Sequence, residues 1–347
     1  MKNPYTLLFG REPEQYIDRP AEAEEIIENF NYDNPSEQIY MITGVRGSGK
    51  TVFMTEISNR LKKNSDWIIV ELSSESNLLE DFASHLASEN SRAEIFKKAK
   101  INLSFWGFGL EVSHTAPITN IQTAITKMLE TLKKHNKKIL ITIDEVINTK
   151  SMKEFASAFQ IFMRQELPVC LLMTGLFENI NELQNEKNLT FLYRAPKIYL
   201  NPLNQKEIAD NYESTLKISK PDADEMAVLT KGYSFAFQVL GHFAWESNGD
   251  FRKITTKFKR YVAEYSYDKI WVELSNKDKD VLFGIAHTSS GKISDIRNYL
   301  NITTNEFNPY SKRLIKKGLI NGEQYGYVNF ILPVFDEYVI ENWEIQP

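Results

Sequence analysis

The sequence predicts an α/β protein in which a parallel β-sheet is followed by a helical region and then by a C-terminal domain of three helices and a hairpin. Short apolar segments alternate with long segments of helical periodicity up to residue 200. From Leu203 to about Trp271 helical patterns dominate, and from Leu274 three of them precede the segment 319–331, which contains two glycines and is typical of a hairpin. Strands that alternate with helices favour a parallel sheet, because each crossover packs a helix against it.

The expected strands are short and mostly apolar, as buried parallel strands should be. They comprise residues 38–43, 67–72, 139–143, 169–174 and 198–200. The clearest helical patterns between them lie at 118–135 and 152–165, and an amphipathic helix over 20–30 precedes the first strand. With 347 residues the chain is long enough for several domains. We expect three, with the bounds 1–202, 203–273 and 274–347.

One segment departs from the alternation of strands and helices. Residues 101–112 first alternate apolar and polar positions and then become rich in glycine and aromatic residues. This pattern indicates a hairpin whose Phe105, Trp106 and Phe108 either cover the protein's own sheet edge or dock on a partner or on single-stranded bases. The first alternative is favoured, because two-stranded ribbons usually need packing to persist.

The composition indicates a folded protein of the cytoplasm. Apolar residues make up 42% and charged residues 25% of the chain, which is typical of globular proteins. The single cysteine, Cys170, excludes an intramolecular disulfide and a cysteine-based metal site. We expect neither a signal peptide nor a membrane span, since apolar runs of about 18 residues are lacking. The net charge of -5 gives no general attraction to nucleic acid.

A phosphate-binding loop is the most specific feature. Residues 44–51 read Gly-Val-Arg-Gly-Ser-Gly-Lys-Thr between a predicted strand and a predicted helix. Such a loop curls its backbone N–H groups around phosphate oxygens at a helix N-terminus, while the lysine reaches the β- and γ-phosphates and the threonine hydroxyl coordinates Mg²⁺. We therefore expect ATP or ADP to be bound by Gly44, Val45, Arg46, Gly47, Ser48, Gly49, Lys50, Thr51 and Val52. The side chain of Arg46 is expected to face solvent.

Acidic and polar residues follow the later strands. Residues 139–146, ILITIDEV, end a strand in Asp144 and Glu145, at the sheet edge where parallel strands bind ligands. Asp144 is expected to hold Mg²⁺ with Thr51, and Glu145 to orient or deprotonate the attacking water. Thr174 closes the next strand and contacts the water or the γ-phosphate, or else forms a turn. Arg194 supplies a cation to the γ-phosphate, in cis or from a neighbouring subunit, or forms a surface ion pair.

In the order of these motifs the sequence resembles the AAA+ and STAND superfamilies of P-loop ATPases, and more narrowly the archaeal-type ATPases related to origin-recognition initiators. The resemblance is very specific at residues 44–51, moderately specific at 139–145 and loose beyond. It implies a P-loop NTPase sheet, a helical lid over 203–273 and a winged helix over 274–347. In that family a hydrophobic pair and Gly-Arg flank the adenine, and here Tyr16 and Ile17 take that place, with Asp18 instead of the glycine. The other interpretation of this pair is packing onto the next helix.

The lid departs from the family pattern. The family places a sensor arginine or a Gly-x-Pro element against the nucleotide, whereas this chain has Gly232-Tyr233-Ser234-Phe235 and has no lysine or arginine between Lys231 and Arg252. This favours a slow ATP-dependent switch over rapid ring-driven hydrolysis. The alternative is a nucleotide-stabilised binding protein with negligible turnover.

The C-terminal module offers a surface for a partner. In residues 303–318 we expect four side chains to pack inward, Phe307, Tyr310, Leu314 and Ile315, and four to present positive charge, Lys312, Arg313, Lys316 and Lys317. Such a helix binds duplex DNA in helix-turn-helix proteins, but the module as a whole is close to neutral. Duplex DNA and a protein partner therefore both stay open, as does a homo-oligomer.

Overall fold

The structure is a computed structural model that describes residues 2–8, 13–288 and 290–343. The chain forms two compact units. The sheet unit contains Pro20–Thr43 and Lys50–Tyr199, and the helical unit contains the residues up to Arg19, the loop Gly44–Gly49 and the residues from Leu200 on. The chain thus leaves the sheet unit after the first strand, contributes six residues to the helical unit and returns at Lys50.

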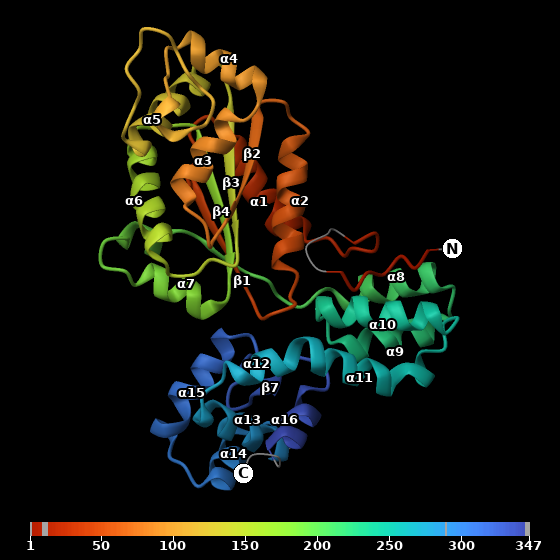
Figure 1. Ribbon diagram of the computed structural model, residues 1–347. Helices are drawn as coiled ribbons and strands as arrows, with labels where there is room; N and C mark the ends of the chain where they lie inside the picture. The colour runs from red at the N-terminus through yellow and green to blue at the C-terminus, as the bar shows by residue number, and fades with distance from the viewer. Residues whose placement is uncertain (1, 9–12, 289, 344–347) are drawn as a thin grey trace. The chain divides into compact units, whose positions relative to one another are not determined.

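The sheet unit confirms the predicted parallel α/β fold (Figure 1). Its strands are β1 (Ile39–Thr43), β2 (Trp67–Ser73), β3 (Lys138–Asp144), β4 (Val169–Gly175) and β5 (Lys197–Tyr199). They lie in the order β2-β3-β4-β1-β5, and every pairing is parallel. All five expected strands are present, and no strand end differs from its expected position by more than one residue.

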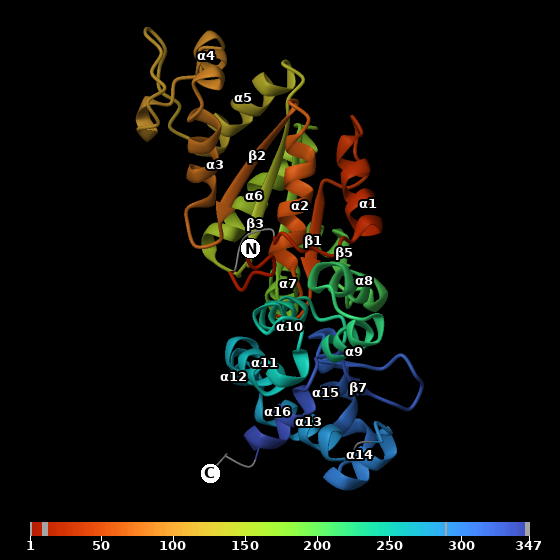
Figure 2. The ribbon, with the colours of Figure 1, turned by 90° about the vertical axis from the view of Figure 1, so that its right-hand side faces the viewer.

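Helices cover both faces of this sheet. The α-helices of the sheet unit are α1 (Pro20–Asn31), α2 (Lys50–Lys62), α3 (Leu78–Ala87), α4 (Asn90–Lys98), α5 (Ile121–Lys133), α6 (Lys150–Arg164) and α7 (Phe177–Gln184). Figure 2 shows α1 and α2 on one face and α3 and α6 on the other. The strands β3 and β4 are buried almost throughout, which explains why they are continuous apolar runs and do not alternate.

The register of the sheet aligns the residues that end its strands. Asp144 pairs with Ser73, and Thr174 pairs with Ile42 of β1. Because all strands run in the same direction, the carboxyl ends of β1, β3 and β4 lie at one edge. Asp144 and Thr174 therefore share the edge from which the chain leaves β1.

The helical unit contains the remaining α-helices and strands and a π-helical turn. They are α8 (Gln205–Leu216), α9 (Lys220–Thr230), α10 (Ser234–Glu246), α11 (Thr255–Val262), a π-helical turn (Ala263–Tyr267), α12 (Asp268–Val272), α13 (Asn276–Thr288), α14 (Ile293–Leu300), α15 (Thr304–Lys316), β6 (Ile320–Asn321), β7 (Asn329–Phe330) and α16 (Phe335–Trp343). The two short strands pair antiparallel, at the position of the expected hairpin. Assignment of α13–α16 as a winged helix stays a prediction, as do the bounds of the three domains.

The N-terminal segment packs within the helical unit. Tyr5 is buried against Tyr212 and Phe237. The amide of Asn211 donates to Gln15 Oε1 at 2.7 Å, and Gln238 donates to the Gln15 carbonyl at 2.5 Å. These contacts tie the N-terminal segment to α8 and α10.

The expected hairpin at residues 101–112 is wrong. This segment contains no strand, only a short 3₁₀ helix at Ser104–Trp106 and a backbone hydrogen bond from Leu103 to Leu110 of 2.8 Å. Gly107 has a φ of 72° and ends the 3₁₀ helix, so the chain curls where an extended ladder was expected. The indole of Trp106 donates to the Ile118 carbonyl at 2.9 Å, whereas Phe105 is 60% exposed.

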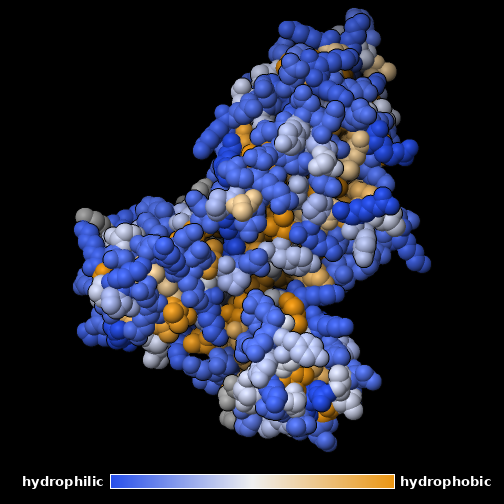
Figure 3. Space-filling view, turned by 180° about the vertical axis from the view of Figure 1, so that it is seen from behind, coloured by the Kyte–Doolittle hydropathy of each residue, from blue (hydrophilic) through white to orange (hydrophobic). Residues whose placement is uncertain are grey.

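The surface of the protein is mainly hydrophilic on the face shown in Figure 3. Within the described ranges, no helix has the length and apolar character needed to cross a membrane.

Candidate active site

The acidic end of β3 is held by two hydroxyl groups. Thr51, in the first turn of α2, donates its Oγ1 proton to Asp144 Oδ2 at 2.8 Å. Thr174, near the end of β4, donates to Asp144 Oδ1. Both carboxylate oxygens are thus engaged by neutral donors, which orient the carboxylate. Three of the predicted site residues therefore lie together.

Glu145 follows in a backbone conformation that is unusual for its residue type. Its φ is 49°, in the left-handed region that non-glycine residues rarely adopt. Its backbone N–H lies 3.1 Å from both Asp144 Oδ1 and Thr174 Oγ1, and the next N–H, of Val146, donates to the Thr174 carbonyl at 2.8 Å. Strained conformations of this kind cost about 1–3 kcal/mol and persist where neighbouring contacts hold them. The side chain of Glu145 is exposed.

The oxygens of Thr51 and Asp144 suit a magnesium ion. Adjacent ligands of octahedral Mg²⁺, at bonds of about 2.1 Å, are separated by roughly 3 Å, and these two oxygens are 2.8 Å apart. The described residues contain no group of three or more His, Cys, Asp or Glu side chains that could hold a metal. A site with one carboxylate and one hydroxyl fits Mg²⁺, which is usually bound by few protein ligands together with substrate phosphates.

The loop 44–49 has the curled backbone that the motif predicts. Gly47 and Gly49 have φ angles of 77° and 91°, in the region that favours glycine. The N–H of Ser48 donates to the Val45 carbonyl at 3.1 Å. The Ser48 hydroxyl is buried and has no hydrogen-bond partner among the residues that the structure describes. It is therefore a donor for an added acceptor such as a phosphate oxygen.

Arg46 makes an ion pair and does not simply face solvent. One of its guanidinium nitrogens lies 3.3 Å from Glu273 Oε1, just after α12, and both side chains are partly exposed. Pairs of this kind contribute about 0–1 kcal/mol.

Three residues to which the sequence had assigned no role contact this loop. The Tyr233 hydroxyl donates to the Arg46 carbonyl at 2.7 Å, and the Ser234 hydroxyl donates to the Ser48 carbonyl at 2.9 Å. The backbone N–H of Phe235 donates to the Gly47 carbonyl at 3.1 Å. The only sequence signal for these contacts was that residues 232–235 fail to match the family's lid patterns.

Three further predicted residues belong to other segments. Ile17 is 6% exposed and packs in the core of the helical unit, and Tyr16 is half-buried. Arg194 is exposed at the end of a short 3₁₀ helix, Thr190–Arg194, that precedes β5. Because β5 runs parallel to β1, a residue ahead of β5 lies toward the amino ends of the strands. The carboxyl ends, with Asp144, lie at the other edge.

One of the four cations expected to bind DNA has a structural partner instead. Arg313 donates through Nε and Nη2 to Asp278 Oδ1 at 2.9 and 2.6 Å, and the Asp278 side chain is 2% exposed. Ile315, expected inside, is 40% exposed, whereas Phe307 and Leu314 are fully buried. The buried face of α15 therefore includes Phe307 and Leu314, as predicted, but not Ile315.

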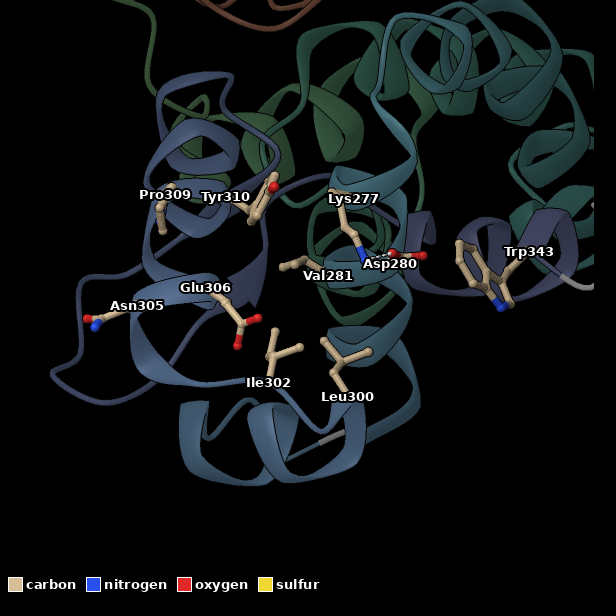
Figure 4. Close-up of a pocket in the computed structure, with 10 residues that line it drawn as sticks. All are labelled: Lys277, Asp280, Val281, Leu300, Ile302, Asn305, Glu306, Pro309, Tyr310 and Trp343. Carbon is tan, nitrogen blue, oxygen red and sulfur yellow. Dashed lines mark ion pairs between the residues drawn. The ribbon is translucent and has the colours of Figure 1, made fainter.

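A groove lies beside α15 in the same unit (Figure 4). It has a volume of about 360 Å³ and is lined by Lys277, Asp280, Val281, Leu300, Ile302, Asn305, Glu306, Pro309, Tyr310 and Trp343. Lys277 and Asp280 form an ion pair of 3.2 Å, and Glu306 completes the capping box of α15 with Thr303. The charged residues of the groove are thus already engaged within the unit.

Comparisons with known proteins agree with the geometry of the sheet and the loop. The profile of an ATPase domain found predominantly in Archaea matches residues 16–195. That of a domain of unknown function matches residues 264–339. A search among curated proteins found no match.

Solved structures share the fold at low sequence identity. The Walker-type ATPase PABY2304 of Pyrococcus abyssi has a TM-score of 0.67 at 17% identity, over 94% of this chain and 96% of that one. The ORC2 protein of Aeropyrum pernix, in ADPNP–ADP complexes, has a TM-score of 0.61 at 15% identity over 94% of each chain. These likenesses confirm the predicted fold class.

Proposed function

The chain belongs to the family of ATPase domains found predominantly in Archaea, and on this premise we propose that it binds ATP with Mg²⁺, hydrolyses it slowly and acts as a nucleotide-dependent molecular switch. The observation that carries this proposal is the cluster in which Asp144 accepts hydrogen bonds from Thr51 and Thr174. In P-loop NTPases a hydroxyl of the phosphate loop and a carboxylate hold the metal, and Thr51 ends that loop motif in the sequence.

The phosphates are bound by the loop and the start of α2. The N–H groups of residues 44–49 and the Lys50 ammonium neutralise them, at the end of a helix whose dipole favours negative charge. Val52 adds the next N–H of this helix end. Thr51 and Asp144 would hold Mg²⁺, which would supply positive charge for the phosphates and for the charge that develops in the transition state. Tyr16 and Ile17 flank the adenine.

Hydrolysis depends on Glu145, which orients the attacking water and accepts its proton. Its carboxylate is exposed, and Glu145 directly follows Asp144 in the sequence. Two successive residues would therefore act on the metal and on the water, Asp144 on the metal and Glu145 on the water. The Thr174 hydroxyl donates to Asp144 and accepts from the Glu145 N–H. Thr174 is therefore proposed to position these two residues, and its predicted contact with the γ-phosphate is not needed. Arg194 precedes β5, which runs parallel to β1, so it lies toward the amino ends of the strands and Asp144 lies at their carboxyl ends. Arg194 is therefore proposed to complete the site of a neighbouring subunit in a homo-oligomer.

The substitution Glu145→Gln tests this assignment. It preserves size and hydrogen bonding but removes the proton acceptor, so we expect nucleotide affinity to be kept and cleavage to slow at least ~10²-fold. Single-turnover hydrolysis of radiolabelled ATP, with the protein in excess, measures the step directly. Wild-type rates in the variant would exclude Glu145 as the base.

A second candidate is a nucleotide-stabilised binding protein with negligible turnover. The absence of lysine and arginine between Lys231 and Arg252 favours it, because the lid then lacks the charge that stabilises a leaving phosphate in many relatives. In the same assay this candidate predicts wild-type cleavage as slow as that of the Glu145→Gln variant.

The output of the switch is a contact made by the C-terminal elements with duplex DNA or with a protein. For DNA, three cations of α15 and its end, Lys312, Lys316 and Lys317, would contact phosphates. Each contact adds about 0.9 to the log–log salt dependence, so replacing all three by Gln should flatten it by roughly two to three units. Fluorescence anisotropy across a salt series measures this slope. A wild-type protein that shows no salt-dependent binding with or without ATP favours the protein partner.

A further inference from the structure

The phosphate loop and the start of α10 are joined residue by residue. Three successive loop carbonyls, of Arg46, Gly47 and Ser48, accept hydrogen bonds from three successive residues of the other segment, Tyr233, Phe235 and Ser234. The bonds measure 2.7, 3.1 and 2.9 Å in that order. All three donors are neutral. We call this set of contacts the loop–lid joint.

The joint supplies a hydrogen-bond acceptor for the N-terminus of α10, which has no capping side chain of its own. The first N–H groups of a helix have no partner within it and are usually satisfied by a capping side chain. In α10 the N-cap residue is Tyr233, whose side chain makes no capping bond. The Gly47 carbonyl accepts from the Phe235 N–H in its place. The first turn of α10 therefore depends on the conformation of the phosphate loop.

Close packing makes this dependence strict. A Cβ atom at Gly47 would collide with the Tyr233 hydroxyl, so only glycine fits there, quite apart from its φ of 77°. The Tyr233 hydroxyl also lies 2.7 Å from Ser266 Oγ, in the π-helical turn. Burial raises the pKa of Tyr233 well above its ordinary value, so the hydroxyl stays protonated and remains a donor. π-Helical turns often mark functional positions.

We propose that Tyr233 is a positioning residue which couples the conformation of the phosphate loop to the lid helix α10 and to the turn 263–267. Through this joint the lid responds to the shape of the loop backbone and not to the charge of the γ-phosphate, so the joint distinguishes the free protein from the nucleotide-bound protein and not ATP from ADP. ADP and ATP should engage the joint equally, because both place a β-phosphate in the loop. This inference rests on the proposed nucleotide site.

The test uses the substitution Tyr233→Phe, which removes one hydroxyl and keeps the ring. A lost neutral hydrogen bond weakens an interaction by about two- to tenfold. We expect the affinities for ADP and for a non-hydrolysable ATP analogue to fall by the same factor in this range. Tyr265→Phe is the matched control, because Tyr265 lies in the same turn, is 46% exposed and has no part in the joint; it should change neither affinity.

Hydrogen exchange provides a readout that needs no nucleotide. The Phe235 amide, which donates to Gly47, should lose protection in Tyr233→Phe, whereas the Gly249 amide, which donates to Ala244 at 2.8 Å, should keep it. In the wild type, ADP and the ATP analogue should raise the protection of Phe235 equally. Unchanged Phe235 protection in Tyr233→Phe, or protection raised by the ATP analogue alone, would overturn the inference. Failure of the wild type to bind either nucleotide would instead refute the proposed function, and exchange in the free protein would still decide on the joint.

Discussion

The ion pair between Arg313 and Asp278 should contribute more to the stability of the helical unit than any other surface cation of α15 does. Asp278 is 2% exposed and accepts two hydrogen bonds from Arg313, at 2.9 and 2.6 Å, and one from the Ser275 hydroxyl at 2.7 Å. Arg313→Gln leaves a buried carboxylate without its cation. Removing one partner of a buried pair costs about 3–5 kcal/mol.

The cost should lie below that range here. Arg313 is 41% exposed, so water reaches the carboxylate once the guanidinium is gone, and Ser275 keeps its bond. We expect a loss of about 2–3 kcal/mol in the free energy of unfolding. Lys312→Gln, the neighbouring exposed cation, should change it by less than about 0.5 kcal/mol.

Urea unfolding followed by tryptophan fluorescence measures both variants, because Trp271 lies in the same unit and packs against Tyr338. Adding Asp278→Asn to Arg313→Gln removes the stranded charge and should restore most of the stability. If Arg313→Gln proves no more destabilising than Lys312→Gln, the pair is not structural, and Arg313 returns to the cations available for DNA.

Three further outcomes test the site and the core. Lys50→Ala should abolish binding of a fluorescent ATP analogue in an equilibrium titration, because it removes the cation that neutralises the β- and γ-phosphates; unchanged affinity would show that the loop is not the nucleotide site. Thr174→Val frees the Asp144 carboxylate, so the Mg²⁺ concentration needed for half-maximal hydrolysis should rise several-fold. Thr174→Ser keeps the hydroxyl and should restore the wild-type Mg²⁺ concentration. Equal Mg²⁺ dependence in the wild type and both variants would contradict the positioning role. Burial raises the pKa of Cys170 to about 12, so the folded protein should resist thiol reagents at pH 8. The protein should lose stability as pH rises from about 9 toward 12, because in this range only the unfolded thiol ionises. Rapid labelling of the native protein would contradict this.

Much of the sheet could be predicted because its signals are local. The strands β3 and β4 are continuous apolar runs, since both of their faces are covered. The order of strands and helices then limits the topology, because crossovers between parallel strands follow fixed rules. The segment 101–112 was misjudged for the same reason: its alternation suggests a strand, but glycines with positive φ curl the chain there.

The sequence by itself determined the phosphate loop, the acidic end of β3 and the strands of the parallel sheet, because the loop, the strand end and each single strand lie within fewer than ten consecutive residues. Only the tertiary structure decided which partners the functional groups have. Thr174 meets Asp144 across 30 residues, Arg313 meets Asp278 across 35, and Tyr233 meets the loop across 187. Contacts between such distant positions leave no periodicity or spacing in a single sequence, since they arise from the packing of elements that are each specified locally.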